Sequence, residues 1–337
     1  MAATNVEVWQ RAVVRETSDA AEGIRRIVLE PSQPVPAAPG THLDLMVSIN
    51  GERHRRSYSI VEAPDGGAQL AISVFRTATS RGGSAYMHTL VPGDELEITQ
   101  PLQNFPLRVG APRYVLLAGG VGITAILNMA RVLKNVKADY RLVYAGRSRS
   151  AMAYLADLQA EHGTALEIHV DAEGTALSVP DLLGGIDDGT ELYMCGPIRL
   201  MDAVRRTWQG LGLDPSSLRY ETFGNSGWYH PEEFVVRVPR LGLETRVGPG
   251  KSMLEALEDA GADMMFDCRK GECGLCEVRI LDLDGAVDHR DVFYSERQQR
   301  AREKMSCCVS RAVKLPAGSA GSAGPGRDPA VVTIEVS

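Results

Sequence analysis

The stretch Cys268-Arg-Lys-Gly-Glu-Cys273-Gly-Leu-Cys276 places three cysteines in one short segment, and Cys308 follows later in the chain. C-x4-C-x2-C with a distant fourth cysteine is the plant-type spacing for a [2Fe–2S] cluster. A loop that supplies three thiolates to one cluster must curl tightly, which Gly271 and Gly274 permit through positive φ. The amides of these glycines can also point at the cluster sulfides and stabilise the reduced state. We therefore predict a [2Fe–2S] centre.

Two points about this centre stay open at this stage. Four cysteines can also bind structural zinc, although zinc ribbons favour two C-x2-C pairs. The fourth ligand is ambiguous because Cys307 and Cys308 are adjacent. Consecutive side chains of an extended chain point to opposite sides, so we expect only one of them to face the cluster.

Composition excludes several classes of protein. The chain has 337 residues, 44% of them hydrophobic, and a net charge of −7. At about 150 residues per domain, this length fits two or three domains. The acidic balance argues against nucleic-acid binding. Glycines interrupt the most apolar run, Tyr114–Ala130, and Glu7, Arg11 and Arg15 leave no secretory signal, so we expect a cytoplasmic protein without a membrane span.

The first third of the chain is typical of a small antiparallel β-barrel. Residues 42–49 alternate, residues 70–75 form a short apolar run, and residues 96–99 follow the turn Pro92-Gly93-Asp94. Several short strands separated by turn signals indicate a barrel. We assign residues 1–109 to this domain.

The middle third alternates between strands and helices, which predicts a parallel α/β sheet with helices on both faces. A buried strand over 114–118 leads through a glycine-rich turn into a helix over 123–133. Later strands are expected over 141–145, 166–170 and 192–194, and later helices over 151–160 and 198–209. We assign residues 110–223 to this domain.

The last third begins after a linker at 224–232, which contains Gly224-Asn225-Ser226-Gly227. We assign residues 233–337 to a third domain, with β-structure from Phe234. One helix is expected over 252–260, with Ser252 as its N-cap and Glu255 three positions later. The run 316–329 reads as a flexible loop, and 331–336 as a closing strand.

The middle third carries a candidate dinucleotide site. Gly119-Gly120-Val-Gly122-Ile-Thr124 follows a buried strand and opens a helix, where backbone amides can approach a pyrophosphate. Cys195-Gly196-Pro197 ends a later strand at the same edge, where a nicotinamide could lie. Arg147 follows the second strand and could favour a 2′-phosphate or be an ordinary surface charge. Taken singly, the glycine turn could be a plain βα turn and Cys195 a buried thiol.

The barrel carries a second candidate site. In Arg56-Ser57-Tyr58-Ser59, the arginine offers a forked donor to a phosphate and the tyrosine can cover a flat ring. Arg81-Gly82-Gly83-Ser84 opens a probable helix and supplies a hydroxyl donor for an anion. The alternatives are a strand-edge arginine with a half-buried tyrosine, and a plain surface turn.

The order of these motifs over nearly the whole chain resembles the phthalate dioxygenase reductase family, the flavin–ferredoxin reductases of two-component Rieske oxygenases. The resemblance implies a flavin-binding barrel, an NAD domain and a C-terminal β-grasp ferredoxin domain. The expected cofactors are FMN, NADH and the [2Fe–2S] cluster. The last cluster ligand of the family sits in Cys-Val-Ser-Arg, which here begins at Cys308. Asp288-His289-Arg290-Asp291 also matches a stretch typical of these ferredoxin domains.

The resemblance also implies roles for individual residues. Cys268, Cys273, Cys276 and Cys308 are the expected metal ligands. Those expected at FMN are Arg56, Ser57, Tyr58, Ser59, Ser73, Val74, Gly82, Gly83, Ser84, Thr124 and Phe223. Those expected at NADH are Gly119, Gly120, Gly122, Arg147, Cys195, Gly196 and Pro197. Ser59, Thr124 and Cys195 are the expected catalytic positions, as ring-positioning groups rather than nucleophiles.

The sequence departs from the family in three places. Phe75 stands where the family often has a lysine, the third and fourth cysteines are a few residues further apart, and the loop before the last strand is longer. None of the length changes touches an expected ligand.

The function implied is electron transfer from NADH through FMN and the cluster to a Rieske-type oxygenase acting on an aromatic acid or a similar small substrate. We expect a monomer that docks its partner near Arg269, Lys270 and Glu272, unless these charges belong to a merely solvated loop. The alternatives are an FAD-containing fusion that serves a diiron or haem oxygenase, and a redox sensor without turnover. NADPH in place of NADH also stays open.

Overall fold

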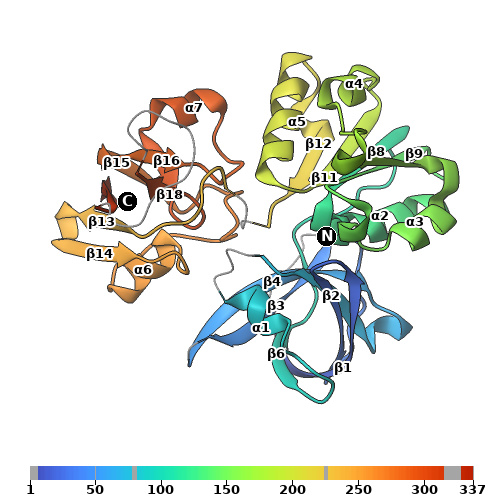
Figure 1. Ribbon diagram of the computed structural model, residues 1–337, viewed down its shortest axis with the longest axis horizontal. Coiled ribbons are helices and arrows are strands. Elements are labelled where there is room, and N and C mark those ends of the chain that lie inside the picture. Colours follow the sequence, from blue (N-terminus) through green and yellow to red (C-terminus); the bar gives the residue numbers. More distant parts are fainter. Residues whose placement is uncertain (1–6, 50, 78–81, 224–226, 315–327, 337) are drawn as a thin grey trace. The chain divides into compact units, whose positions relative to one another are not determined.

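The computed structural model describes residues 7–49, 51–77, 82–223, 227–314 and 328–336 (Figure 1). The chain divides into two compact units, Met1–Glu221 and Thr222–Ser337. The predicted domain boundaries at residues 109 and 223 and the linker at 224–232 remain predictions. None of the described helices is long and apolar enough to cross a membrane.

An antiparallel barrel forms the first part of the first unit. Its strands follow the order β4-β5-β2-β1-β6-β3, and a pairing between β3 and β4 closes the ring. Inward-facing side chains such as Leu43, Leu45 and Ile72 form its core. The two-residue strand β7 (Leu102–Gln103) pairs with β3, and a short helix, α1 (Gly83–Met87), lies against β3 and β5. The barrel strands are β1 (Trp9–Ala21), β2 (Ile24–Pro31), β3 (Thr41–Ile49), β4 (Glu52–Glu62), β5 (Leu70–Phe75) and β6 (Glu95–Thr99).

A five-stranded parallel sheet forms the rest of the first unit, in the order β10-β9-β8-β11-β12. The strand order reverses after β10, so right-handed crossovers place α2 and α3 on one face and α4 and α5 on the other (Figure 1). The strands are β8 (Arg113–Gly119), β9 (Tyr140–Gly146), β10 (Leu166–Val170), β11 (Thr190–Cys195) and β12 (Leu218–Glu221). The helices are α2 (Ile123–Asn135), α3 (Leu155–His162), α4 (Val179–Gly184) and α5 (Ile198–Gly210).

These elements confirm the predicted parallel α/β sheet, with one correction. The helix expected over 151–160 begins only at Leu155, because Tyr154 adopts a left-handed conformation with φ of 61°. Met152 is extended and packs its side chain close to Gly146 at the end of β9. The segment 152–154 therefore follows the sheet before the helix starts.

The second unit is built on a mixed five-stranded sheet in the order β14-β13-β19-β15-β17, beside a two-stranded sheet of β16 and β18. Strands β13 and β19 are parallel, and α6 packs its buried face into the core beneath the sheet. The strands are β13 (Phe234–Val238), β14 (Leu243–Val247), β15 (Glu277–Asp284), β16 (Ala286–Asp288), β17 (Lys304–Ser306), β18 (Arg311–Val313) and β19 (Ala330–Glu335). The helices are α6 (Met253–Asp259) and α7 (Glu296–Ala301).

The helix predicted over 252–260 is confirmed as α6, with the expected cap. The Ser252 hydroxyl accepts a hydrogen bond from the Glu255 amide at 3.1 Å, and the Glu255 carboxylate accepts one from the Ser252 amide at 2.7 Å. This capping box satisfies amides that the first turn would otherwise leave without partners. The predicted loop at 316–329 lies almost entirely outside the described residues.

A buried ion pair fixes the start of the second unit. The Arg290 guanidinium contacts the Asp288 carboxylate at 2.6 Å, and both side chains are almost fully buried. The other Asp288 oxygen accepts the Trp228 amide at 3.0 Å, and Arg290 donates to the Tyr229 carbonyl at 3.0 Å. Both charges thus have the hydrogen bonds that burial demands. The Asp288–Asp291 segment therefore ties residues 228–229 to the end of strand β16.

Candidate functional site

The cysteine loop has the backbone conformation that its glycines predict. Gly271 and Gly274 have φ values of 77° and 78°. A Cβ atom at Gly274 would lie 2.3 Å from the Phe293 ring, so this position excludes any larger residue. The carbonyl of Gly271 accepts the Val292 amide at 3.0 Å, which ties the loop to the segment after β16. The expected tight curl is confirmed.

The thiols of the loop lie in two groups. Cys268 is hydrogen-bonded to Cys273, and burial raises the pKa of Cys268. Cys276 is hydrogen-bonded to the thiols of Cys307 and Cys308, which lowers the pKa of Cys276 to about 3. Within the described ranges, no set of three metal-binding side chains converges on a single ion position.

Cys307 and Cys308 have different surroundings. The Cys307 thiol donates to the Cys276 carbonyl at 3.1 Å, and its own carbonyl accepts the Leu254 amide of α6 at 2.9 Å. Cys308 interacts electrostatically with both Cys276 and Cys268, whereas Cys307 interacts with Cys276 and with Glu258 of α6. The assignment of Cys308 as the fourth ligand and of Cys307 as a packed thiol stays a prediction.

Backbone amides already point at a cysteine sulfur. The amides of Lys270 and Glu272 each donate to Cys268 Sγ at 3.4 Å. Such donors stabilise negative charge on a thiolate ligand. The predicted role of the Gly271 and Gly274 amides toward the cluster sulfides stays a prediction.

Thr222, the first residue of the second unit, is bound to the same loop. Its amide donates to the Glu272 carboxylate at 2.7 Å, and its hydroxyl donates to the Lys270 carbonyl at 2.7 Å. The Arg269 guanidinium lies 3.9 Å from the Phe266 ring centroid and donates to Glu258 at 2.9 Å. Arg269 and Glu272, two of the three charges expected to dock a partner, are thus engaged within the unit, and Lys270 is buried.

The exposed side chains around the loop are largely apolar. Met265 is 62% exposed, Leu275 47% and Phe293 42%. Large apolar side chains gathered on a surface are typical of protein–protein contact. Large apolar side chains are thus exposed around the loop, beside the exposed Asp267.

Two loops meet at the carboxyl edge of the parallel sheet. Strands β8 and β11 pair in parallel, with Ala118 opposite Cys195. A Cβ atom at Gly122 would lie 2.1 Å from the Cys195 carbonyl oxygen, so only glycine fits there. Gly196 approaches Gly119 closely, and the Pro197 ring packs on the Gly119 backbone. The two motifs predicted to bind NADH are thus one continuous surface.

The remaining predicted nucleotide residues surround this edge. Gly120 has φ of 54° and open space where a side chain would stand, which suits close approach of a ligand. Thr124 is buried in the first turn of α2 and donates its hydroxyl to the Val121 carbonyl at 2.9 Å. Arg147 lies exposed after β9.

The predicted phosphate residues of the barrel also come together. A Cβ atom at Gly83 would lie 2.6 Å from Arg56 Nε, so the Arg56 side chain lies directly on the start of α1. This start holds Gly82, Gly83 and Ser84, whereas Arg81 lies outside the described residues. The cradle formed by a guanidinium and a short turn without side chains fits a phosphate.

The Arg56–Ser59 motif splits between the two faces of β4. Tyr58 packs at the edge of the barrel core. Alternation along the strand places Arg56 on the same face as Tyr58 and Ser57 on the opposite face. The Ser57 hydroxyl donates to the buried carboxylate of Asp44, directly across on β3.

Ser73 and Val74 lie in the buried part of β5. The Ser73 hydroxyl is hydrogen-bonded to the Tyr154 hydroxyl at 2.5 Å, and the Val74 carbonyl contacts the His88 ring at 2.8 Å. The Ser73 side chain is thus engaged with the segment before α3. Phe223 belongs to the second unit, and its expected contact with the flavin stays a prediction.

Glu221 is a site residue that the sequence reasoning missed. The Ser59 hydroxyl donates to the Glu221 carboxylate at 3.5 Å, and Glu221 is only 2% exposed. Glu221 also lies directly opposite Cys195 in the parallel pairing of β11 and β12. Only recognition of 218–221 as the last strand of the sheet would have placed this carboxylate beside Ser59 and Cys195.

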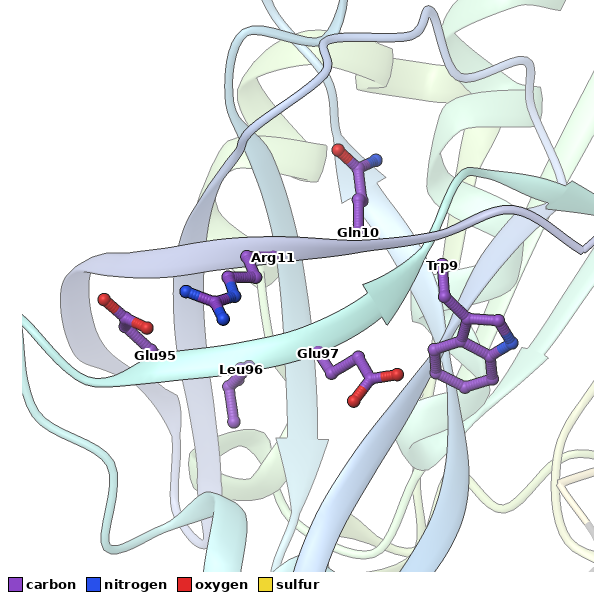
Figure 2. A pocket seen from close by; sticks show the side chains of 6 residues that line it. All are labelled: Trp9, Gln10, Arg11, Glu95, Leu96 and Glu97. Carbon is purple, nitrogen blue, oxygen red and sulfur yellow. The ribbon is translucent and has the colours of Figure 1, made fainter.

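A separate depression lies on the outside of the barrel, between β1 and β6. Figure 2 shows its lining: Trp9, Gln10, Arg11, Glu95, Leu96 and Glu97. None of these residues belongs to the predicted sites. The depression has charged side chains of both signs and a single aromatic ring, which indicates no particular ligand.

Comparisons with known proteins found matches to the cysteine-containing domain and to the segment that includes the parallel sheet. Residues 236–313 match the 2Fe-2S iron-sulfur cluster binding domain, and residues 100–218 match the N-terminal domain of dimethylamine monooxygenase subunit DmmA-like proteins. The chain is 31% identical to the carnitine monooxygenase reductase subunit of Escherichia coli (strain K12), over 89% of this chain and 94% of that protein. It is 34% identical to the heme-dependent oxidative N-demethylase beta subunit of Ectopseudomonas mendocina (strain ymp), over 82% of this chain and 87% of that protein.

A solved structure covers both units. The structure of phthalate dioxygenase reductase matches with a TM-score of 0.72 and 27% identity, over 97% of this chain and 98% of that one. The chain belongs to the phthalate dioxygenase reductase family. As a member of this family, it is an oxidoreductase that passes electrons as the reductase component of an oxygenase system. The barrel, the parallel sheet and the ferredoxin domain are those of phthalate dioxygenase reductase, which confirms the predicted fold class.

Proposed function

We propose that this reductase passes electrons from NADH through FMN and a [2Fe–2S] cluster to a Rieske-type oxygenase acting on an aromatic acid or a similar small substrate. The observation that carries this proposal is the meeting of Ser59, Glu221 and Cys195. Ser59 belongs to the barrel, whereas Glu221 and Cys195 end adjacent strands of the parallel sheet. A flavin ring on the barrel and a nicotinamide on the sheet edge would therefore face each other.

The residues on the barrel side hold the flavin in this proposal. Arg56, with Gly82, Gly83 and Ser84, binds the phosphate of FMN, and Tyr58 covers the ring. A bound flavin takes up a hydride as an electron pair and releases electrons singly, and the [2Fe–2S] cluster takes them one at a time. The Glu221 carboxylate holds the Ser59 hydroxyl at this edge, and with flavin bound Ser59 would turn its single hydroxyl hydrogen from Glu221 to the ring.

The sheet edge holds the nucleotide. The turn from Gly119 to Gly122 receives the pyrophosphate at the start of α2, where the helix dipole favours negative charge. The loop from Cys195 to Pro197 positions the nicotinamide beside the flavin. No side chain has to transfer a proton for hydride transfer, so the contribution of these residues is proximity and orientation.

Cys268, Cys273, Cys276 and Cys308 would hold the cluster, which would supply one-electron transfer. The apolar surface of Met265, Leu275 and Phe293 beside the loop is the docking surface for the oxygenase. The protein acts as a monomer in this scheme.

A haem-dependent oxygenase is the second candidate partner. The observation in its favour is the 34% identity to a protein named as the beta subunit of a heme-dependent oxidative N-demethylase. The two candidates share the route from NADH to the cluster and differ only in the acceptor.

Anaerobic stopped-flow absorbance with the purified holoprotein tests the route. We expect NADH to bleach the flavin band first and the cluster band afterwards, and mass spectrometry of the released flavin to give FMN. Flavin reduction without cluster reduction would contradict the proposed order. The gene neighbourhood names candidate oxygenases, and NADH oxidation coupled to each purified oxygenase then identifies the partner.

A further inference from the structure

Two charged loops lie together at the edge of the sheet. Strand β9 ends at Gly146 and β10 at Val170, which are directly paired. The loop after β10 returns to the loop after β9 through a hydrogen bond from the Ala172 amide to the Arg147 carbonyl at 3.0 Å. The charged side chains after the second and third strands of the sheet therefore form one cluster.

An arginine in this cluster is held by a glutamate. Arg149 Nε lies 2.7 Å from Glu173 Oε1, and a terminal nitrogen of Arg149 lies 2.9 Å from Oε2, so the pair is bidentate. Arginine offers its donors to carboxylate and phosphate in the same planar geometry. While Glu173 is bound, these two donors of Arg149 are not offered to a phosphate.

The cluster has more negative than positive charges. It holds Arg147 and Arg149 with Asp171 and Glu173, and Glu22 adds a third carboxylate through its contact with Ser150 at 2.7 Å. A 2′-phosphate brings up to about two negative charges and requires a positive surface. In nucleotide-binding sheets of this type, the adenosine ribose lies near the end of the second strand, here β9. A ribose hydroxyl fits such a neutral to acidic surface, whereas a phosphate does not.

We propose that Glu173 determines the nucleotide specificity of this reductase, making it prefer NADH over NADPH. Glu173 holds the Arg149 guanidinium and places a carboxylate where a 2′-phosphate would lie. This inference rests on the proposed function, because it requires that a pyridine nucleotide binds the carboxyl edge of the sheet. It assigns the discrimination between NADH and NADPH to Glu173, in the loop after β10, rather than to Arg147.

The test compares Glu173→Gln with the wild-type holoprotein, using NADH or NADPH and ferricyanide as the acceptor. We expect kcat/KM for NADPH to rise about tenfold and kcat/KM for NADH to change by less than about twofold. The double variant Glu173→Gln/Arg149→Ala should lose the rise in kcat/KM for NADPH, because Arg149, once released from Glu173, is the residue that binds the 2′-phosphate. The gain should shrink at high salt, since the pair is half exposed.

A matched control exists on the barrel. Arg15 and Glu30 form an equally exposed bidentate pair, with distances of 2.7 and 2.8 Å. Glu30→Gln removes the same charge from the same unit and should leave the ratio of the two nucleotides unchanged. Inhibition by 2′,5′-ADP should strengthen in Glu173→Gln but not in Glu30→Gln, whereas inhibition by 5′-ADP should change in neither.

Four outcomes overturn the inference. An unchanged NADPH/NADH ratio in Glu173→Gln overturns it while NADH turnover still supports the proposed function. An equal shift in Glu30→Gln, or a wild-type protein that already prefers NADPH, also overturns it. Failure of both nucleotides to reduce the wild-type flavin would overturn the proposed function and this inference together.

Discussion

The adjacent cysteines at 307 and 308 differ in what their thiols face. Cys308 interacts with both thiol groups of the loop, whereas Cys307 donates to the Cys276 carbonyl beside α6. We expect Cys308→Ser to abolish the visible absorbance of the iron–sulfur cluster and Cys307→Ser to retain it. Iron and sulfide content, measured after anaerobic purification, checks both variants. Loss of the cluster in Cys307→Ser alone would reverse the assignment.

The buried Glu221 carboxylate makes a second prediction at the residue scale. Because it receives the Ser59 hydroxyl, Glu221→Gln should misorient that donor and slow flavin reduction by NADH by about tenfold, with little change in nucleotide affinity. Stopped-flow reduction over a range of NADH concentrations separates the two quantities. Glu191→Gln, near the other end of β11, is the control and should reduce at the wild-type rate. An unchanged rate in Glu221→Gln would show that Ser59 needs no orienting partner.

Individual site residues differ in how far the sequence could predict them. The cysteine ligands follow from spacing, because three thiolates in one loop leave few alternatives. Glu221 does not, because its carboxylate becomes a site residue only through the pairing of β12 with β11. Ser57 shows the converse: it sits inside a recognisable motif, yet strand alternation directs its hydroxyl to Asp44.

At the scale of elements, the cysteine loop depends on glycine at one position. Gly274 combines φ of 78° with a ring only 2.3 Å from where a Cβ atom would lie. Gly274→Ala should therefore shift the loop and lower the cluster content to less than about half of the wild-type value. Gly248→Ala is the control, because Gly248 has open space and an ordinary φ. Full cluster occupancy in Gly274→Ala would contradict the prediction.

The end of α3 carries a pH-dependent contact. The His162 side chain is fully buried, its Nδ1 lies 2.6 Å from the Tyr140 hydroxyl, and burial lowers the pKa of His162. The unfolded chain therefore binds more protons below about pH 6.5, so this histidine makes stability fall as the pH drops through that value. His162→Gln should cost about 1–2 kcal/mol at pH 8, and the difference should narrow at pH 5.5.

Urea unfolding at the two pH values measures this difference. His230→Gln is the control, because the His230 side chain is exposed and its substitution should leave the free energy of unfolding unchanged. A constant difference between wild type and His162→Gln at both pH values would mean that the histidine does not titrate differently on unfolding.

Strands and helices were predicted most accurately from the sequence where nearly all side chains of the element are buried. After its exposed first residue, Arg113, strand β8 is apolar and buried because helices cover both faces of the sheet, and its sequence shows this directly. The long strands β1 and β4 carry many charged residues, because one face of each lies in solvent. Their amino-acid composition therefore did not indicate strands. Helix α3 starts late because Tyr154 turns left-handed, a conformation that the preference of tyrosine does not indicate.

At the scale of the whole molecule, the apolar surface beside the cysteine loop should serve the partner oxygenase. Leu275→Ser should raise the KM for the oxygenase several-fold in coupled turnover, because the interface loses apolar contact. Ferricyanide reduction by the variant should stay at the wild-type rate. Leu281→Ser is a matched control, because Leu281 is also 47% exposed but lies on β15. An equal effect of both substitutions would place docking elsewhere.

The three-part architecture followed from the order of motifs, because each motif requires its own kind of strand or helix around it. The nucleotide preference could not be read in the same way. Arg147 and Arg149 are visible in the sequence, but the carboxylate that neutralises Arg149 comes from the loop after the next strand, 24 positions away. Only the folded sheet shows that the two charges cancel.

Thr222 gives the second unit an unusual point of attachment. The chain enters this unit at a residue already tied to Lys270 and Glu272 by its amide and its hydroxyl. The first residue of the second unit is thus hydrogen-bonded directly to the cysteine loop, with no intervening residues. A displacement of the chain at Thr222 would therefore be transmitted to the metal-binding segment through these two hydrogen bonds.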